Sequence, residues 1–237
     1  MKTLTWFFDL DNTLHDASFA IFGAINGTIS DYLRRHLAID EADADRLRVY
    51  YWQRYGATLL GLIKHHTVDP HHFLRETHAF AHGADFATMV RAERGMTQLF
   101  RRLPGRKVLL TNAPASYAAA VLRQIGLHRQ FTQPRGRRYA IEQMRVHRHF
   151  RPKPSKPMLR MLLAKEKVAP SRAVLLDDSR ENLKSARAVG MRTVLVNGLA
   201  PPTGLMPFGR GKKSRPGYVG LQVKSVGQML RRRRYLR

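Results

Sequence analysis

The sequence of 237 residues contains no cysteine. This absence excludes disulfide bonds, thiolate metal ligands and a cysteine nucleophile. The sequence also lacks any run of about 18 apolar residues, the length that spans a bilayer, and residues 1–3 lead directly into an acidic motif. It therefore predicts neither a membrane-spanning helix nor a signal peptide, and the expectation is a soluble, cytoplasmic protein.

Acidic residues are scarce, because 17 Asp and Glu stand against 42 Lys and Arg, for a formal net charge of +25. Residues 201–237 carry ten Lys or Arg and no acid, and only Glu142 interrupts the basic stretch 129–153. Charge of this kind attracts polyanions. Two interpretations stay open: a solvated surface and tail, or weak non-specific binding of nucleic acid by the basic tail. Recognised RNA- or DNA-reading motifs are absent.

Three apolar runs of strand length end in polar residues. They are followed by Asp9 and Asp11, by Thr111 and Asn112, and by Asp177 and Asp178. Alternate side chains of an extended strand share a face, so Asp9 and Asp11 are expected on one side. In open parallel sheets, ligands bind outside the carboxyl ends of the strands. The three polar groups are therefore predicted to converge on one crevice.

The order of the remaining patterns predicts the architecture. Residues 15–95 show helical periodicity and no strand alternation, as in the four-residue spacing of Ile21, Ile25, Ile29, Leu33 and Leu37. From residue 107 strands and helices alternate, with a basic loop at 131–138, a short strand at 139–141 and a buried strand at 192–196. Residues 221–223 are expected either as an edge strand or packed on the core.

The predicted fold class is α/β, a Rossmann-like parallel sheet with an inserted all-helical cap. Residues 1–14 and 96–200 form the predicted core and residues 15–95 the cap. Residues 201–237 form a basic C-terminal extension.

Four short motifs occur in a characteristic order: residues 9–13 (DLDNT), 110–112 (LTN), 153–154 (KP), and 177–179 (DDS) with Asn182. In this order they resemble the motifs of the haloacid dehalogenase superfamily, whose members are mostly phosphatases. The resemblance covers roughly residues 4–198. Residues 51–56, 60–62 and 65–66 are also similar to the caps of pyrimidine 5′-nucleotidases.

The resemblance implies catalytic roles for Asp9 and Asp11 that agree with the chemistry of phosphoryl transfer. Asp9 would attack phosphorus and become an aspartyl phosphate. Asp11 would protonate the leaving oxygen and then deprotonate the water that hydrolyses the intermediate, a contribution of typically ~10²–10⁴-fold. The neighbouring charge of Asp9 is expected to raise the pKa of Asp11 toward this task.

The resemblance also implies a phosphate site and a Mg²⁺ site. Thr111 and Asn112 would donate hydrogen bonds to the phosphate, and Lys153 would neutralise it, with Lys156 as a rival candidate. Mg²⁺ would be bound by Asp9, by the backbone carbonyl of Asp11 and by one acid of the pair Asp177 and Asp178. Asp178 is favoured as the direct ligand, whereas Asp177 would lie outside the coordination sphere and support the ligands.

The leading interpretation is a Mg²⁺-dependent phosphatase of nucleotide metabolism, a 5′-nucleotidase acting on nucleoside 5′-monophosphates, with UMP or CMP favoured. A sugar-phosphate phosphatase, or another small-molecule phosphatase with the same core, is the nearest alternative. A basic nucleic-acid-binding protein is the alternative from another class. A dehalogenase is disfavoured, because cleaving a carbon–halide bond needs no second aspartate to protonate an alkoxide.

The aromatic and histidine residues of the cap leave a further choice open. Tyr51, Trp52 and Tyr55 could stack on a nucleobase or pack in the cap. The six histidines between residues 65 and 82 lack the spacing typical of zinc sites. They are expected to be solvated or packed in the core, and the oligomeric state is not predicted.

Overall fold

The computed structural model describes residues 4–132, 136–199 and 216–232, without the side chains of residues 231 and 232. The chain forms two compact units, an α/β unit before residue 20 and after residue 89, and a helical unit of residues Ala20–Met89. The sequence predicts these boundaries after residues 14 and 95. No helix in the described part of the chain is long and apolar enough to cross a membrane.

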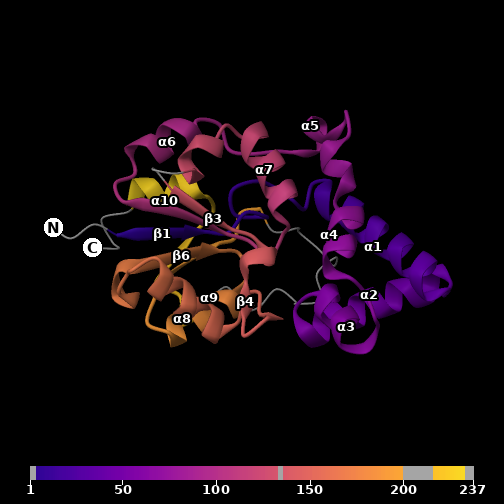
Figure 1. Cartoon of the computed structure of the whole chain (residues 1–237). Coiled ribbons are helices and arrows are strands. Elements are labelled where there is room, and N and C mark those ends of the chain that lie inside the picture. Colours follow the sequence, from indigo (N-terminus) through magenta and orange to yellow (C-terminus); the bar gives the residue numbers. More distant parts are fainter. Residues whose placement is uncertain (1–3, 133–135, 200–215, 233–237) are drawn as a thin grey trace. The chain divides into compact units, whose positions relative to one another are not determined.

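A six-stranded sheet forms the centre of the α/β unit (Figure 1). The strands have the order β3-β2-β1-β6-β7-β8 and every neighbouring pair is parallel. Their bounds are β1 Thr5–Phe8, β2 Arg106–Leu110, β3 Gly136–Tyr139, β6 Ala173–Asp177, β7 Arg192–Val196 and β8 Leu221–Val223. A separate antiparallel hairpin joins β4 Arg145–Val146 to β5 His149–Phe150. The predicted α/β class with a parallel sheet is thereby confirmed.

Helices cover both faces of this sheet. Figure 1 shows α6, α7 and α10 on one face and α8 and α9 on the other. Their bounds are α6 Met96–Arg102, α7 Ala115–Gln124, α8 Lys156–Lys165, α9 Arg180–Ala188 and α10 Val226–Arg232; the 3₁₀ turns are η2 His128–Phe131, η3 Ile141–Gln143 and η4 Pro170–Arg172. Phe7 belongs to the cluster that contains Met158 and Leu162 of α8, whereas Phe8 packs against Phe100 with ring centroids 4.8 Å apart. Both sides of β1 are thus buried, as a central parallel strand requires.

The helical unit contains α1 Ile21–Leu37, α2 Glu41–Tyr55, α3 Thr58–His65, α4 Pro70–Thr77, η1 Ala79–His82 and α5 Phe86–Met89. The periodic stripe that predicts α1 supplies the buried Ile21, Ile29 and Leu33. Asp40 caps α2 by accepting a hydrogen bond from the Asp43 amide at 2.8 Å. The prediction of an inserted all-helical segment is confirmed.

The position of the third strand differs from the prediction. The sequence analysis places it at residues 139–141, but β3 spans Gly136–Tyr139 and residues 141–143 form a 3₁₀ turn. A Cβ at Gly136 would lie 2.5 Å from the Lys107 carbonyl oxygen, so glycine permits the close approach to β2. Arg137 and Arg138 suggested a loop, yet an edge strand tolerates charged side chains.

The described part of the basic extension continues the sheet. β8 pairs with β7, with Val194 opposite Leu221, so the edge-strand alternative for residues 221–223 is the correct one. The Gly227 amide of α10 donates to Glu93 at 3.1 Å. The predicted nucleic-acid binding by the basic tail stays a prediction, because the arginine side chains of residues 231–234 lie outside the described part of the chain.

Candidate active site

The carboxyl ends of three neighbouring strands bring the predicted site residues together. Asp9 follows β1, Thr111 and Asn112 follow β2, and Asp177 ends β6. β1 lies between β2 and β6, and the Asp9 amide donates to the Leu176 carbonyl at 2.9 Å. The chain builds the sheet outward from β1 through β2 and β3, then crosses to β6. This reversal is the topological switch point at which ligands bind in open α/β sheets.

Three carboxylates form a cluster at this edge. Asp9, Asp177 and Asp178 each offer an oxygen, and these oxygens lie within 4.8 Å of one another. Burial, together with the charges of Asp177 and Asp11, raises the pKa of Asp9 to about 7 even though Lys153 opposes the shift. Burial and the charges of Asp9 and Asp177 likewise raise the pKa of Asp178 well above its usual range. Burial and mutual repulsion therefore disfavour full ionisation of the cluster.

Lys153 lies inside the cluster, and its side chain is almost completely buried. Its Nζ donates to Oδ1 of Asp9 at 2.6 Å and to Oδ2 of Asp177 at 2.8 Å. Burial lowers the pKa of Lys153, but the charges of Asp177 and Asp9 outweigh burial and hold that pKa above its ordinary value. Lys153 is therefore a permanent cation. The rival, Lys156, is exposed at the first position of α8.

The side chain of Asn112 holds the backbone of Lys153. Its Nδ2 donates to the Lys153 carbonyl at 3.0 Å, and its Oδ1 accepts from the Lys153 amide at 2.9 Å. Thr111 is buried, and its hydroxyl oxygen accepts from the Ala113 amide at 3.0 Å. In this arrangement Asn112 fixes the loop that carries the lysine.

The two acids after β6 have different surroundings. Oδ1 of Asp177 accepts from the Ser179 amide and from Nδ2 of Asn182, both at 2.9 Å, while Oδ2 accepts from Lys153. No residue in the described ranges donates a hydrogen bond to the Asp178 side chain, which is only partly buried. Asp177 is thus occupied by the protein on both oxygens, and Asp178 is the acid that can accept a further partner.

Asp11 is held by two side chains that the sequence analysis does not single out. Its Oδ1 lies 2.8 Å from Nε2 of His15 and 2.6 Å from the hydroxyl of Tyr117. Burial and the charge of Asp11 raise the pKa of Tyr117 well above its ordinary value, so the phenol stays protonated and donates. A histidine four residues after Asp11 is the one signal in the sequence that could have indicated the first contact.

The carboxylate cluster suits a hard divalent cation. Mg²⁺ takes oxygen ligands and is usually bound through one or two carboxylates. Asp9, Asp177 and Asp178 provide such oxygens, and a divalent cation among them would offset the burial and the mutual repulsion that raise the pKa values of Asp9 and Asp178. Asp9 and Asp178 are therefore chemically suitable ligands, and ligation by the backbone carbonyl of Asp11 stays a prediction.

The aromatic residues of α2 are engaged within the helical unit. Tyr51 is buried, and its hydroxyl lies 2.7 Å from Nε2 of His66. The Tyr55 hydroxyl lies 2.6 Å from Nε2 of His65. These contacts show the two tyrosines and two of the histidines supporting one another, and the side chain of Trp52 is partly buried beside them in α2.

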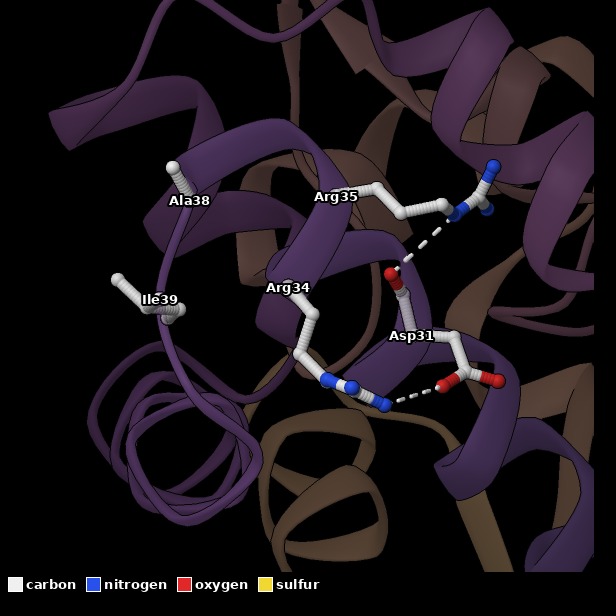
Figure 2. Close-up of a pocket in the computed structure, with 5 residues that line it drawn as sticks. All are labelled: Asp31, Arg34, Arg35, Ala38 and Ile39. Carbon is white, nitrogen blue, oxygen red and sulfur yellow. Dashed lines mark hydrogen bonds and ion pairs between the residues drawn. The ribbon is translucent and has the colours of Figure 1, made fainter.

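A pocket lies at the end of α1 in the helical unit (Figure 2). Nη1 of Arg34 lies 3.5 Å from Oδ1 of Asp31, and Nε of Arg35 donates to the Asp31 carbonyl at 3.3 Å. Arg35 also forms an ion pair with Glu76 at 2.8 Å. The residues that line the pocket are Asp31, Arg34, Arg35, Ala38 and Ile39. None of them is a predicted site residue, and the arginines are already paired, so the pocket adds no catalytic group.

The chain is similar to a curated protein and to several solved structures. Phosphate metabolism protein 8 of Saccharomyces cerevisiae is 24% identical over 198 residues, which are 80% of this chain and 60% of that protein. The chain thus spans about 60% of the length of this curated relative.

Solved structures of the same fold include a haloacid dehalogenase (HAD) phosphatase from Thermococcus onnurineus, at 18% identity and a TM-score of 0.60 over 98% of this chain and 97% of the other. CbbY from Rhodobacter sphaeroides, solved in complex with phosphate, has 17% identity and a TM-score of 0.61 over 96% of each chain. The sequence profile of haloacid dehalogenase-like hydrolases matches residues 5–190. The chain belongs to the haloacid dehalogenase-like hydrolases.

Proposed function

We propose that this hydrolase is a phosphatase that cleaves small phosphate monoesters through an aspartyl-phosphate intermediate. The observation that carries the proposal is the convergence of Asp9, Lys153 and the pair Asp177 and Asp178 at the carboxyl ends of β1 and β6. A buried carboxylate beside a fixed cation suits attack on an anionic phosphoryl group. Relatives described as a phosphatase and as a complex with phosphate support the same reaction class.

In the proposed reaction, an oxygen of Asp9 attacks phosphorus, and the bond from phosphorus to the leaving oxygen breaks. Asp11 gives its proton to that leaving oxygen. Asp11 then takes a proton from the water that attacks phosphorus of the intermediate, which restores the Asp9 carboxylate and releases inorganic phosphate. The two steps use Asp11 first as an acid and then as a base.

The remaining residues would bind and neutralise the phosphate. Lys153 supplies a charge that the pairs with Asp9 and Asp177 hold in place. Thr111 would donate a hydrogen bond to a phosphate oxygen. Asn112 would keep Lys153 in position through its two hydrogen bonds to the Lys153 backbone. A hydrogen bond from Asn112 to the phosphate stays a prediction. When bound by Asp9, Asp178 and the Asp11 carbonyl, Mg²⁺ would supply positive charge that stabilises the phosphoryl oxygens.

The substrate class is the finer part of the proposal. The similarity of residues 51–56, 60–62 and 65–66 to pyrimidine 5′-nucleotidase caps supports nucleoside 5′-monophosphates, with UMP and CMP preferred. Tyr51 and Tyr55, which that similarity contains, are hydrogen-bonded to His66 and His65. Because those contacts already explain the two tyrosines, a sugar phosphate or another small phosphate ester is the second candidate.

A substrate panel tests both levels of the proposal. Phosphate release would be measured with Mg²⁺ for UMP, CMP, AMP, GMP, ribose 5-phosphate and glucose 6-phosphate, with Asp11→Asn as the inactive control. The proposal expects the highest kcat/KM for UMP and CMP and a loss of about 10²–10⁴-fold in the control. A preference for the sugar phosphates would refute the nucleotide assignment, and no release from any ester would refute the phosphatase.

A further inference from the structure

His15 and Tyr117 form a buried clamp around one oxygen of Asp11. Nε2 of His15 and the Tyr117 hydroxyl both reach Oδ1 of Asp11, at 2.8 Å and 2.6 Å, and lie 3.4 Å from each other. The side chain of His15 has no exposed surface, Tyr117 is fully buried, and 19% of the Asp11 side chain is exposed. The clamp is therefore closed to solvent, whereas the acid that it holds reaches the surface of the site.

The burial of His15 is not explained by packing alone. Its Nδ1 is buried and has no hydrogen-bond partner among the described residues. Buried polar atoms without partners are rare and unfavourable, and an apolar side chain would avoid this one. The hydrogen bond from Nε2 to Asp11 is what an apolar residue would not supply, so the histidine is best explained by its effect on that acid.

Two separate segments of the backbone bring the donors to Asp11. The Leu10 carbonyl accepts from the amides of Leu14 at 2.8 Å and His15 at 3.4 Å, which folds residue 15 back under residue 11. Asn12, at φ 54°, makes this turn possible. Tyr117 comes from the first turn of α7, which follows β2. A hydrogen-bonded turn and a helix thus place the two donors beside Asp11 in the protein without substrate.

An aspartate carboxyl group rotates easily about its last torsion, because that torsion has only a broad, two-fold preference. Two donors on the same oxygen remove this freedom. We propose that His15 and Tyr117 are positioning residues that hold the Asp11 carboxyl group in the orientation needed for both proton transfers. The inference rests on the proposed function, in which Asp11 is the acid and the base.

Positioning of this kind predicts a specific kinetic pattern. Loss of either donor is expected to lower kcat by about 10- to 100-fold, the scale on which a misplaced catalytic group slows a reaction. For an alkyl phosphate such as UMP, whose two steps both need Asp11, KM is expected to change little, because neither residue belongs to the proposed phosphate or metal ligands. For 4-nitrophenyl phosphate, of which only the second step should slow, KM is expected to fall together with kcat. A residue that only supports the fold would instead lower the fraction of active protein.

The test uses Tyr117→Phe and His15→Leu, with His15→Gln as the rescue variant because its amide nitrogen can take the place of Nε2. Tyr139→Phe is the matched control, since it removes another buried hydrogen bond from a tyrosine to a carboxylate, that of Glu166. Circular dichroism identifies the variants that fold. If His15→Leu does not fold, the more conservative Tyr117→Phe still tests the inference.

Rapid mixing with 4-nitrophenyl phosphate separates the two steps. Nitrophenolate leaves without a proton, so the first step should stay fast and the second should slow in the clamp variants. We expect a nitrophenolate burst of about one per active site, then steady turnover about 10- to 100-fold below wild type, with partial recovery in His15→Gln. The control should keep the wild-type kcat. UMP or another alkyl phosphate should give no burst of its alcohol product, because its leaving oxygen needs the proton of Asp11.

Three results would overturn the inference, and they are distinguishable. If the wild-type chain hydrolyses 4-nitrophenyl phosphate and the folded clamp variants keep its kcat, the positioning role is wrong and the proposed function stands. If the wild-type chain hydrolyses neither ester with Mg²⁺ present, the proposed function is wrong and the inference is lost with it. If the clamp variants lose no more kcat than Tyr139→Phe does, the clamp contributes to stability and not to the positioning of Asp11.

Discussion

Replacing Lys153 with methionine should destabilise the protein more than any exposed lysine replacement. Nζ of Lys153 lies 2.6 Å from Asp9 and 2.8 Å from Asp177, and its side chain is only 2% exposed. Methionine keeps a similar length of unbranched chain but leaves both buried acids without their cation. Removing one partner of a buried ion pair typically costs about 3–5 kcal/mol, so we expect a loss of this size in the free energy of unfolding.

The loss should depend on pH. The pKa of Asp9 is already raised to about 7, and Lys153 is the group that opposes a further rise. A carboxyl group with a raised pKa in the folded state stabilises fully below its unfolded pKa, and that stability is lost as pH rises through the folded pKa. Without Lys153 the pKa of Asp9 in the folded state rises further, so the folded protein goes on losing stability up to a higher pH. The deficit of Lys153→Met should therefore be large at pH 8 and smaller at pH 5.

Urea unfolding with a chelator present measures this deficit. The chain has two tryptophans. Trp6 lies in β1 of the α/β unit, and Trp52 lies in α2 of the helical unit. Fluorescence of Trp6 in a Trp52→Phe background therefore reports the α/β unit alone. Lys156→Met is the matched control, because Lys156 is exposed. An equal loss in both variants at pH 8, or a deficit that does not shrink at pH 5, would refute the reasoning.

Two further predictions concern the metal site and the helical unit. At pH 8, Mg²⁺ at about 100 times its Kd should stabilise the chelator-treated protein against unfolding by about 2.7 kcal/mol, as measured by urea titration. Asp178→Asn should remove this gain in stability. If the variant keeps the gain, Asp178 is not a ligand. Gly61→Ala places a Cβ 2.2 Å from the Tyr51 ring and should destabilise the helical unit by about 1–3 kcal/mol in thermal melts followed by Trp52 fluorescence. In contrast Gly23→Ala, which meets nothing within 4 Å, should be neutral or stabilising, and equal effects would contradict the packing of α2 on α3.

The strand ends were predictable because their signals are local. Each of the runs before Asp9, Thr111 and Asp177 is apolar and then stops at polar residues, and a parallel sheet places such ends at one edge. The helix after β6 was equally predictable, because Ser179 caps α9 at Asn182 and Gly190 follows it at φ 92°.

The third strand was misplaced because its residues resemble a loop. Charged Arg137 and Arg138 follow Gly136, whereas the more apolar Ala140 and Ile141 lie beyond the strand. β3 is held by its pairing with β2, in which Lys107 lies opposite Gly136. Pairing of this kind depends on residues about 30 positions apart, which no local pattern contains.

The clamp around Asp11 could not be predicted for a related reason. Tyr117 and Asp11 are 106 positions apart and meet only because α7 follows the strand that pairs with β1. The tyrosine also lies in a helix whose other buried residues are apolar, so its spacing indicated core packing. Only the position of its hydroxyl distinguishes it from the residues around it.

The central claim is that the carboxylate cluster at the ends of β1 and β6 is the catalytic site and that Asp9 is its nucleophile. The most direct measurement is phosphate release from 4-nitrophenyl phosphate and UMP, with Mg²⁺, by wild type and by folded Asp9→Asn. We predict release by the wild type and none above background by Asp9→Asn, which removes the attacking carboxylate and keeps its shape. Asp9→Asn turnover at the wild-type rate would contradict the claim.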